Sequence, residues 1–282
     1  MKTIDTDLGQ FQIDLSVEGY SPGWWEVFNN KSYEPDTAAF IKRFVNEHTI
    51  FLDVGSSVGN FTLYAALKAN RVIAYEPYPK IYLSLLANIK ANPDLSNKII
   101  AKKSAVSDFS KVLTKALDRT VISTISGASL DEFGVVDVVS LKSEIEDIKF
   151  SDKNLVIKMD IEGAEFKILK HIETLKVLKN RKAIMLVALH PGFTHPVKES
   201  KSSVIKIFRK VIFWAKNILE LNEIFNALGD SCKVYRTNLN PVKKSKAIIL
   251  MLGGYYEFII DFSSKIDISE VNLWFFSQKR SI

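Results

Sequence analysis

Three observations in the sequence predict an α/β fold with a mostly parallel sheet. Strand-like and helix-like runs alternate from about residue 50 onward, which is typical of βαβ units. The chain has 282 residues, of which 47% are hydrophobic and 25% charged, so it can form a core and is neither disordered nor fibrous. Because the sequence contains no internal repeat and no low-complexity linker, we expect one domain with elaborations.

Local patterns predict the regular elements from residue 49 to residue 189. Strands are expected at the apolar runs 50–54, 71–75, 98–101, 154–159 and 183–189. Helices are expected where apolar residues recur at helical spacing, at 60–69, 79–91 and 164–178. In the last of these helices, the stripe expected against the sheet consists of Phe166, Ile168, Leu169 and Ile172.

The first 48 residues predict an arm that packs on the main domain of residues 49–282. A short alternating strand is expected to contain Phe11, Ile13 and Leu15, and Ser21-Pro22-Gly23 is expected to form a turn. A helix begins near Glu34-Pro35-Asp36-Thr37, where proline suits the first helical turn.

One long helix is expected at residues 201–228, with lysines opposite an apolar face of Val204, Phe208, Val211, Ala215, Ile218 and Phe225. The segments after it, 233–237, 247–252, 257–262 and 272–278, are predicted to be closing strands. The apolar face has two candidate partners, which are the protein's own core or a subunit interface, and the surface of a membrane.

Composition indicates the cellular compartment in which the protein is expected to act. The single cysteine, Cys232, cannot form an internal disulfide, and with four histidines it cannot build an ordinary four-ligand zinc site. The first residues lack the apolar segment of a secretory signal, and no run of about 18 apolar residues occurs. We therefore expect a cytoplasmic protein without a transmembrane segment.

The formal net charge of +6 is concentrated in one region. Residues 201–246 contain ten Lys and Arg against three acids, a local charge of +7, and the rest of the chain is close to neutral. Such a basic surface suits phosphate groups on nucleic acid, anionic lipid or a nucleotide-linked sugar, and it also suits plain solvent exposure.

The segment Asp53-Val54-Gly55-Ser56-Ser57-Val58-Gly59-Asn60 leads from an apolar strand through small residues into a helix. This geometry presents backbone N–H groups and the positive end of a helix to a ligand. The pattern departs from the dinucleotide fingerprint G-x-G-x-x-G, so a pyrophosphate ligand is not favoured. A tight turn without a ligand is the alternative.

Two further strand ends carry acids. Glu76 comes 23 residues after Asp53 and can accept hydrogen bonds from ribose hydroxyls, unless it is only a surface acid before Pro77. Asp160 and Glu162 follow the strand at 154–159, and we expect them to face the same crevice, because ligands of open α/β sheets lie outside the carboxyl ends of strands. Glu165 is explained by the dipole of the helix that begins there.

These motifs together resemble the FkbM family of S-adenosylmethionine-dependent methyltransferases. The resemblance rests on residues 53–60, Tyr75-Glu76-Pro77 and residues 158–165, with support from 33–37 and 271–275, and it covers most of residues 30–280. It implies a Rossmann-like class I methyltransferase fold, whose seven-stranded, mostly parallel sheet has a reversed last strand and helices on both faces. It also implies methylation of a hydroxyl, often on a sugar or glycan.

The resemblance assigns roles to individual residues. The methionine end of S-adenosylmethionine would be lined by the loop residues Asp53, Gly55, Ser57, Gly59 and Asn60. Glu76 would hold the ribose, Ser107 or Asp108 would lie near the adenine, and Asp160 would lie by the sulfonium and amino group. Glu34 would reach the same pocket, although an acid before Pro35 is equally explained as helix entry.

Transfer of a methyl group to an alcohol requires a positioned acceptor and a base. The candidate bases are Glu162, His190 and Asp160, and a reaction without a dedicated base is the fourth possibility. His190 has the better-matched ordinary pKa, near 6.5, whereas a carboxylate near 4 is a weak base for an alcohol. Lys158 would neutralise Asp160, contact an acceptor phosphate or only lie at the rim of the sheet, and His195 would border the acceptor or lie in a loop.

A metal site is not predicted, because Asp160 and His190 have no third ligand that the sequence identifies. A nicotinamide-dependent oxidoreductase is disfavoured by the absent fingerprint. A nucleic-acid methyltransferase would explain the basic region, but the chain has Asp160-Ile161-Glu162-Gly163 where amino-methylating enzymes usually carry Asn/Asp-Pro-Pro-Tyr. Nucleic acid is therefore not the expected partner. Two alternatives to sugar methylation remain open: methylation of another small-molecule acceptor, and a scaffold that binds the cofactor without turnover.

Overall fold

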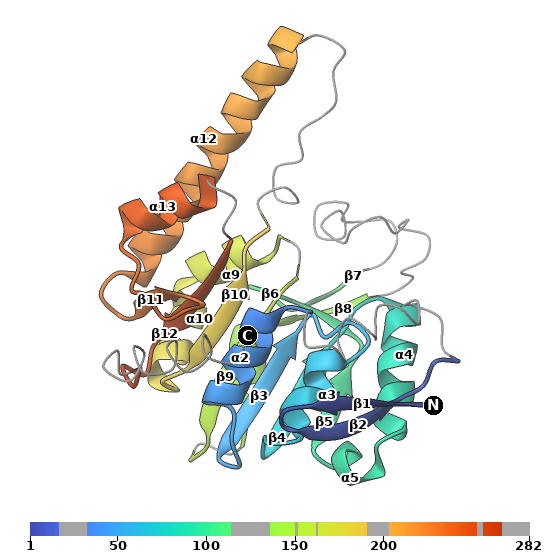
Figure 1. The fold of residues 1–282 in the computed structure, drawn as a ribbon. Coiled ribbons are helices and arrows are strands. Elements are labelled where there is room, and N and C mark those ends of the chain that lie inside the picture. Colours follow the sequence, from blue (N-terminus) through green and yellow to red (C-terminus); the bar gives the residue numbers. More distant parts are fainter. Residues whose placement is uncertain are drawn as a thin grey trace, which may run out of the picture.

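The computed structural model describes residues 1–16, 33–113, 136–149, 152–161, 163–190, 203–252 and 256–266. Within these ranges the main sheet has seven strands in the order β11-β12-β10-β9-β3-β4-β5 (Figure 1). Their bounds are β3 Thr49–Val54, β4 Arg71–Tyr75, β5 Ile99–Lys102, β9 Asn154–Met159, β10 Ile184–Ala188, β11 Lys233–Arg236 and β12 Glu257–Asp261.

The register confirms the predicted sheet with a reversed last strand. β3 pairs in parallel with both β4 and β9, and β10 pairs in parallel with β9. β12 runs antiparallel to β10, with Glu257 opposite Ala188, and β11 runs antiparallel to β12. The carboxyl ends of the parallel strands therefore share one edge, at which β12 begins.

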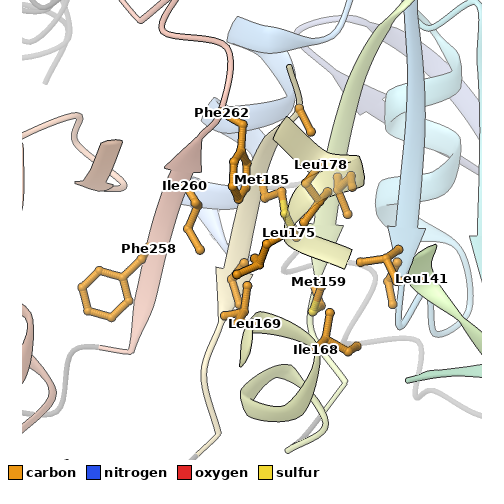
Figure 2. Close-up of a cluster of buried hydrophobic side chains, with 14 of the residues drawn as sticks. Leu141, Met159, Ile168, Leu169, Leu175, Leu178, Met185, Phe258, Ile260 and Phe262 are labelled. Carbon is orange, nitrogen blue, oxygen red and sulfur yellow. The ribbon is translucent and has the colours of Figure 1, made fainter. Parts of the chain in front are cut away.

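Helices cover both faces of this sheet. They are α2 Pro35–Phe44, α3 Asn60–Ala66, α4 Pro79–Lys90, α5 Pro93–Ser96, α8 Leu141–Glu146, α9 Glu165–Lys170, α10 Ile172–Asn180, α12 Ser203–Leu228 and α13 Lys244–Leu252. Successive residues of β3 point to opposite faces, so Phe51 lies in one core and Leu52 in the other. Figure 2 shows the second core, where α9 and α10 pack against β9 and β10.

Two smaller sheets flank the main one. β1 Lys2–Thr6 and β2 Gly9–Ile13 form a hairpin, whereas β6 Ser104–Ser107, β7 Lys111–Leu113 and β8 Val136–Ser140 form a three-stranded sheet that the sequence analysis did not predict. The hairpin residues Ile4, Phe11 and Ile13 lie in the same core as Phe51. This packing supports the proposal that residues 1–48 are an arm on the domain of residues 49–282. Leu15, predicted to continue the strand, lies beyond β2 and is exposed.

The single helix predicted at 164–178 is wrong, because the structure has two helices there. The backbone of His171 is extended (φ −78°, ψ 105°), and it ends α9 and precedes α10. Phe166, Ile168 and Leu169 are buried as predicted. Ile172 begins the second helix and is 63% exposed, so it does not belong to the apolar stripe.

The strand predicted at 247–252 is also wrong, since these residues lie in α13. An apolar run of this length does not distinguish a strand from a buried helix. In the structure Ala247 and Met251, four residues apart, are buried while Ile249 between them is 68% exposed, which is a helical pattern. The turn predicted at 21–23 and the strand at 272–278 lie outside the described residues.

The long helix α12 is confirmed, and apolar residues occupy two of its sides. Its contacts with the core are made by Asn217, Leu221, Ile224 and Leu228. Val211 and Ala215, on the predicted apolar face, are exposed, so this part of the face does not pack on the protein's own core. Phe225, also on the predicted face, packs against the core, whereas a subunit interface or a membrane surface as partner of the exposed part stays a prediction. No helix that the structure describes combines the length and the apolar character that crossing a bilayer requires.

Candidate cofactor and acceptor site

The loop between β3 and α3 lies against the ends of its two neighbouring strands. The N–H groups of Gly55 and Ser56 both donate to the carbonyl of Tyr75 (3.1 and 3.0 Å), at the end of β4. Gly55 has φ +84°, and a Cβ atom there would lie 1.9 Å from the carbonyl oxygen of Asp160. Glycine is therefore required by both the backbone conformation and the close approach of β9.

Glu76 is tied to this loop through its carboxylate. Ser57, whose φ is +51°, donates its N–H to Glu76 Oε2 (3.0 Å), and the N–H of Tyr78 donates to Oε1 (2.8 Å). Burial raises the pKa of Glu76 to about 7, although these two hydrogen bonds act in the opposite direction. The second strand end therefore places a nearly buried acid directly beside the glycine loop, as the sequence predicts.

Lys158 links the loop to two acids. Its Nζ donates to the carbonyl of Gly55 (3.0 Å) and lies 3.6 Å from Asp53 Oδ1 and 3.8 Å from Asp160 Oδ2. Burial alone would lower the pKa of Lys158, but the carboxylates of Asp53, Asp160 and Glu34 together raise it above its ordinary value. These contacts favour the neutralising role that the sequence allowed, while contact of Lys158 with an acceptor stays a prediction.

Asp53 is fully buried at the end of β3. Its Oδ2 accepts a hydrogen bond from Thr62 Oγ1 (2.6 Å), and burial raises the pKa of its carboxyl. Among the described residues its Oδ1 has no hydrogen-bond partner, and it forms an ion pair with the ammonium of Lys158. Asp53 therefore connects the strand, the first turn of α3 and the cluster of charges beneath the loop.

His190, which follows β10, lies between two carboxylates. Its Nδ1 is 3.1 Å from Glu165 Oε1 and its Nε2 is 3.5 Å from Asp160 Oδ1. Glu165 is fully buried and accepts hydrogen bonds from the N–H groups of Ile161 (2.9 Å) and Gly163 (2.6 Å). Because this carboxylate is an acceptor, the His190 ring presents its Nδ1–H to Glu165, and a neutral ring keeps the lone pair of Nε2 toward Asp160.

Glu165 does more than the predicted interaction with the helix dipole, because it contacts His190. Glu165 lies in the same short sequence motif as Asp160, which could have indicated a role in the site, but only the fold shows that Glu165 reaches His190. Asp160, Glu165 and His190 offer ligand atoms within 4.8 Å of one another, so they form a group that could hold a divalent metal ion. The backbone N–H groups already bound to both oxygens of Glu165 favour its role as a hydrogen-bond partner of His190.

Glu257 is a site residue that the sequence analysis missed. It begins β12 opposite Ala188, the last residue of β10, and His190 follows two residues later. Burial, together with the nearby acids Glu34, Asp36 and Asp160, raises the pKa of Glu257 to about 7. Acids from α2, β9 and β12 therefore lie within electrostatic reach of one another, and the edge of the sheet carries excess negative charge.

The other predicted residues fall into two groups. Asn60 is buried at the start of α3, Gly59 (φ +92°) packs against Leu85, and Ser107 Oγ donates to Asp108 Oδ1 (2.9 Å) after β6. Glu162 and His195 lie outside the described residues, so their predicted roles stay predictions.

Comparison with known proteins identifies the family. Residues 53–213, more than half of the chain, match the family model described as the methyltransferase FkbM domain. This segment includes the glycine loop, Glu76, Asp160 and His190. No curated protein matches the chain.

Several solved structures are similar to the chain at low identity. Methyltransferase FkbM of Methylobacillus flagellatus is 12% identical with a TM-score of 0.44, and the alignment covers 86% of this chain and 55% of that one. The chain thus spans just over half the length of that protein. A methyltransferase of Streptococcus mutans in complex with SAH is 8% identical with a TM-score of 0.41, and the alignment covers 80% of this chain and 94% of that one. An O-methyltransferase of Bacillus cereus in complex with SAH is 14% identical with a TM-score of 0.39, and the alignment covers 86% of this chain and 90% of that one. On the match over residues 53–213, the chain belongs to the FkbM family of S-adenosylmethionine-dependent methyltransferases.

Proposed function

We propose that this methyltransferase transfers a methyl group to a hydroxyl, and that the acceptor is a sugar or glycan. The observation that carries the proposal is the His190 imidazole held between Glu165 and Asp160, beside the glycine loop. An alcohol must lose its proton during methyl transfer, and a histidine held at one nitrogen can take that proton at the other. The sugar is supported by the family resemblance alone.

The residues at the carboxyl edge fit the cofactor. S-adenosylmethionine supplies an electrophilic methyl group on a positively charged sulfur. The loop from Gly55 to Gly59 gives a close approach without side chains, and Glu76 beside it can accept hydrogen bonds from ribose hydroxyls. Asp160 and Glu34 would compensate the positive charge of the sulfonium and amino groups.

The proposed chemistry assigns one proton to one atom. His190 Nε2 accepts the proton of the acceptor hydroxyl, while Glu165 holds the Nδ1–H and so fixes the orientation of the ring. Asp160 stabilises the imidazolium that results. Glu162 is the competing base from the sequence analysis. We also propose a cytoplasmic site of action, since the chain has only one cysteine.

The test uses ¹³C-methyl-labelled S-adenosylmethionine with a panel of sugars, glycans and amines. The carbon chemical shift of the product methyl group distinguishes an ether from an N-methyl amine. His190→Ala should lower kcat by roughly 10² to 10⁴, the range for loss of a general base, and should leave SAH affinity nearly unchanged. The matched control is His48→Ala, since His48 is exposed after α2, and it should have no effect.

Glu162→Gln separates the two candidate bases. If Glu162→Gln lowers kcat by that factor and His190→Ala does not, the base is the glutamate. Methyl groups found only on amines would show that the proposal of O-methylation is wrong. SAH binding without turnover on any acceptor in the panel would support a catalytically silent scaffold.

A further inference from the structure

We propose that the amino-terminal part of α12, residues 203–219, docks on an anionic lipid membrane surface. This helix has 26 residues, and its carboxyl-terminal part is anchored to the protein. Leu221, Ile224 and Leu228 are buried in the core beside α9. Lys170 of α9 also forms ion pairs with Glu220 (2.6 Å) and Glu223 (2.9 Å). Figure 1 shows the amino-terminal turns projecting beyond the rest of the described structure.

The outward face of residues 211–219 is apolar. Val211 is 59% exposed, Ile212 is 40% exposed and Leu219 is 62% exposed. Together with exposed Ala215 they are spaced so that they lie on one side of the helix, opposite the buried residues Asn217 and Leu221. An apolar face of this length on a projecting helix is typical of an interaction surface.

The charges of the same part all have one sign. Residues 203–219 contain Lys206, Arg209, Lys210 and Lys216, and the first acid is Glu220. By their positions along the helix, Arg209 and Lys216 lie at one flank of the apolar face. At the other flank, the ring of Trp214 packs edge-on against Phe213, with centroids 5.0 Å apart. Cations and a tryptophan at the flanks of an apolar face characterise helices that lie in a membrane interface.

Charge selects the lipid surface over a second copy of the chain. Two copies packed through this face would bring Arg209 and Lys216 of each copy together, four cations in all, with no acid on residues 203–219 of either copy to compensate them. An anionic headgroup layer neutralises these charges while the apolar face enters the boundary with the acyl chains. Exposed Lys243 and Lys246, at the start of α13, add positive charge next to α12.

The experiment is co-sedimentation of the full chain with vesicles of phosphatidylcholine alone or with 30% phosphatidylglycerol. We expect binding to the anionic vesicles, little binding to the neutral ones, and loss of binding as salt rises. Val211→Glu should weaken binding at least tenfold, and Arg209→Gln combined with Lys216→Gln should weaken it similarly. SAH affinity reports that each variant is folded, and none of these residues belongs to the cofactor site.

Matched controls carry the same chemical changes elsewhere. Ile172→Glu changes an equally exposed apolar residue on α10, and Lys90→Gln with Lys179→Gln removes two exposed charges. Both should bind vesicles like the wild type. Equal binding by Val211→Glu and the wild type would overturn the proposal. Absence of binding to anionic vesicles would also overturn it. So would a dimer of the chain that Val211→Glu abolishes and that anionic vesicles do not dissociate, or complete displacement of the vesicles by RNA added at the same total negative charge.

Discussion

Replacing Gly55 by alanine tests whether the loop after β3 is the cofactor cradle. The new Cβ atom would lie 1.9 Å from the carbonyl oxygen of Asp160, and the residue would keep φ near +84°. The left-handed conformation costs an L-residue about 1–2 kcal/mol. To relieve the contact the loop must also move away from β9 by about 1 Å, a displacement that can lower turnover by roughly 10² when it occurs in an active site.

Gly229→Ala is the matched control for this substitution. Gly229 has φ +50°, but a Cβ there would meet only the carbonyl oxygen of Asn226, at 3.8 Å. Urea unfolding should show a loss of about 1–2 kcal/mol for this variant, and calorimetry should show wild-type SAH affinity. Gly55→Ala should lose more stability, and its Kd for SAH should rise at least tenfold. If Gly55→Ala instead binds SAH like the wild type while Gly229→Ala is destabilised as expected, the loop does not hold the cofactor.

Three further substitutions test individual acids of the site. Glu76→Gln should raise the Kd for SAH at least tenfold, whereas the control Asp261→Asn, at the opposite edge of the sheet, should alter stability only. Because the Glu76 carboxyl has a pKa of about 7 and ribose hydroxyls favour its charged form, the SAH affinity of the wild type should rise as pH increases through 7, and this pH dependence should vanish in Glu76→Gln. Glu165→Gln should lower kcat and change its pH profile with little effect on SAH affinity, and a profile identical to that of the wild type would contradict a positioning role through His190. Glu257→Gln should raise the melting temperature at pH 8 but not at pH 5, because the carboxyl has a pKa of about 7 in the folded protein and its charged form, present at pH 8, destabilises the fold. An equal shift of the melting temperature at both pH values would exclude this cause.

Much of the fold could be predicted because the buried strands are short apolar runs bounded by turns. The expected strands at 71–75 and 154–159 match β4 and β9 residue for residue. The errors arise where tertiary contacts decide. The run at 247–252 is apolar enough for a strand or a helix. The same contacts decide how much of each apolar side of α12 meets the core.

The site shows the same division. Gly55, Glu76 and Asp160 could be predicted because each follows a parallel strand, and parallel strands end at one edge. The link between Glu165 and His190 could not be predicted, since it joins the start of α9 to the end of β10 across 25 residues. Glu257 could not be found because its place depends on the antiparallel register of β12 against β10.

Calorimetric titration of the wild-type chain with S-adenosylmethionine, SAH and NAD tests most directly whether the carboxyl edge of β3, β4 and β9 is the cofactor site. We expect S-adenosylmethionine and SAH to bind and NAD not to bind. Because Glu76 has a raised pKa, binding at pH 7 should also release protons, which appear as a dependence of the measured heat on the ionisation enthalpy of the buffer. Tight binding of NAD without binding of S-adenosylmethionine would contradict the proposed site.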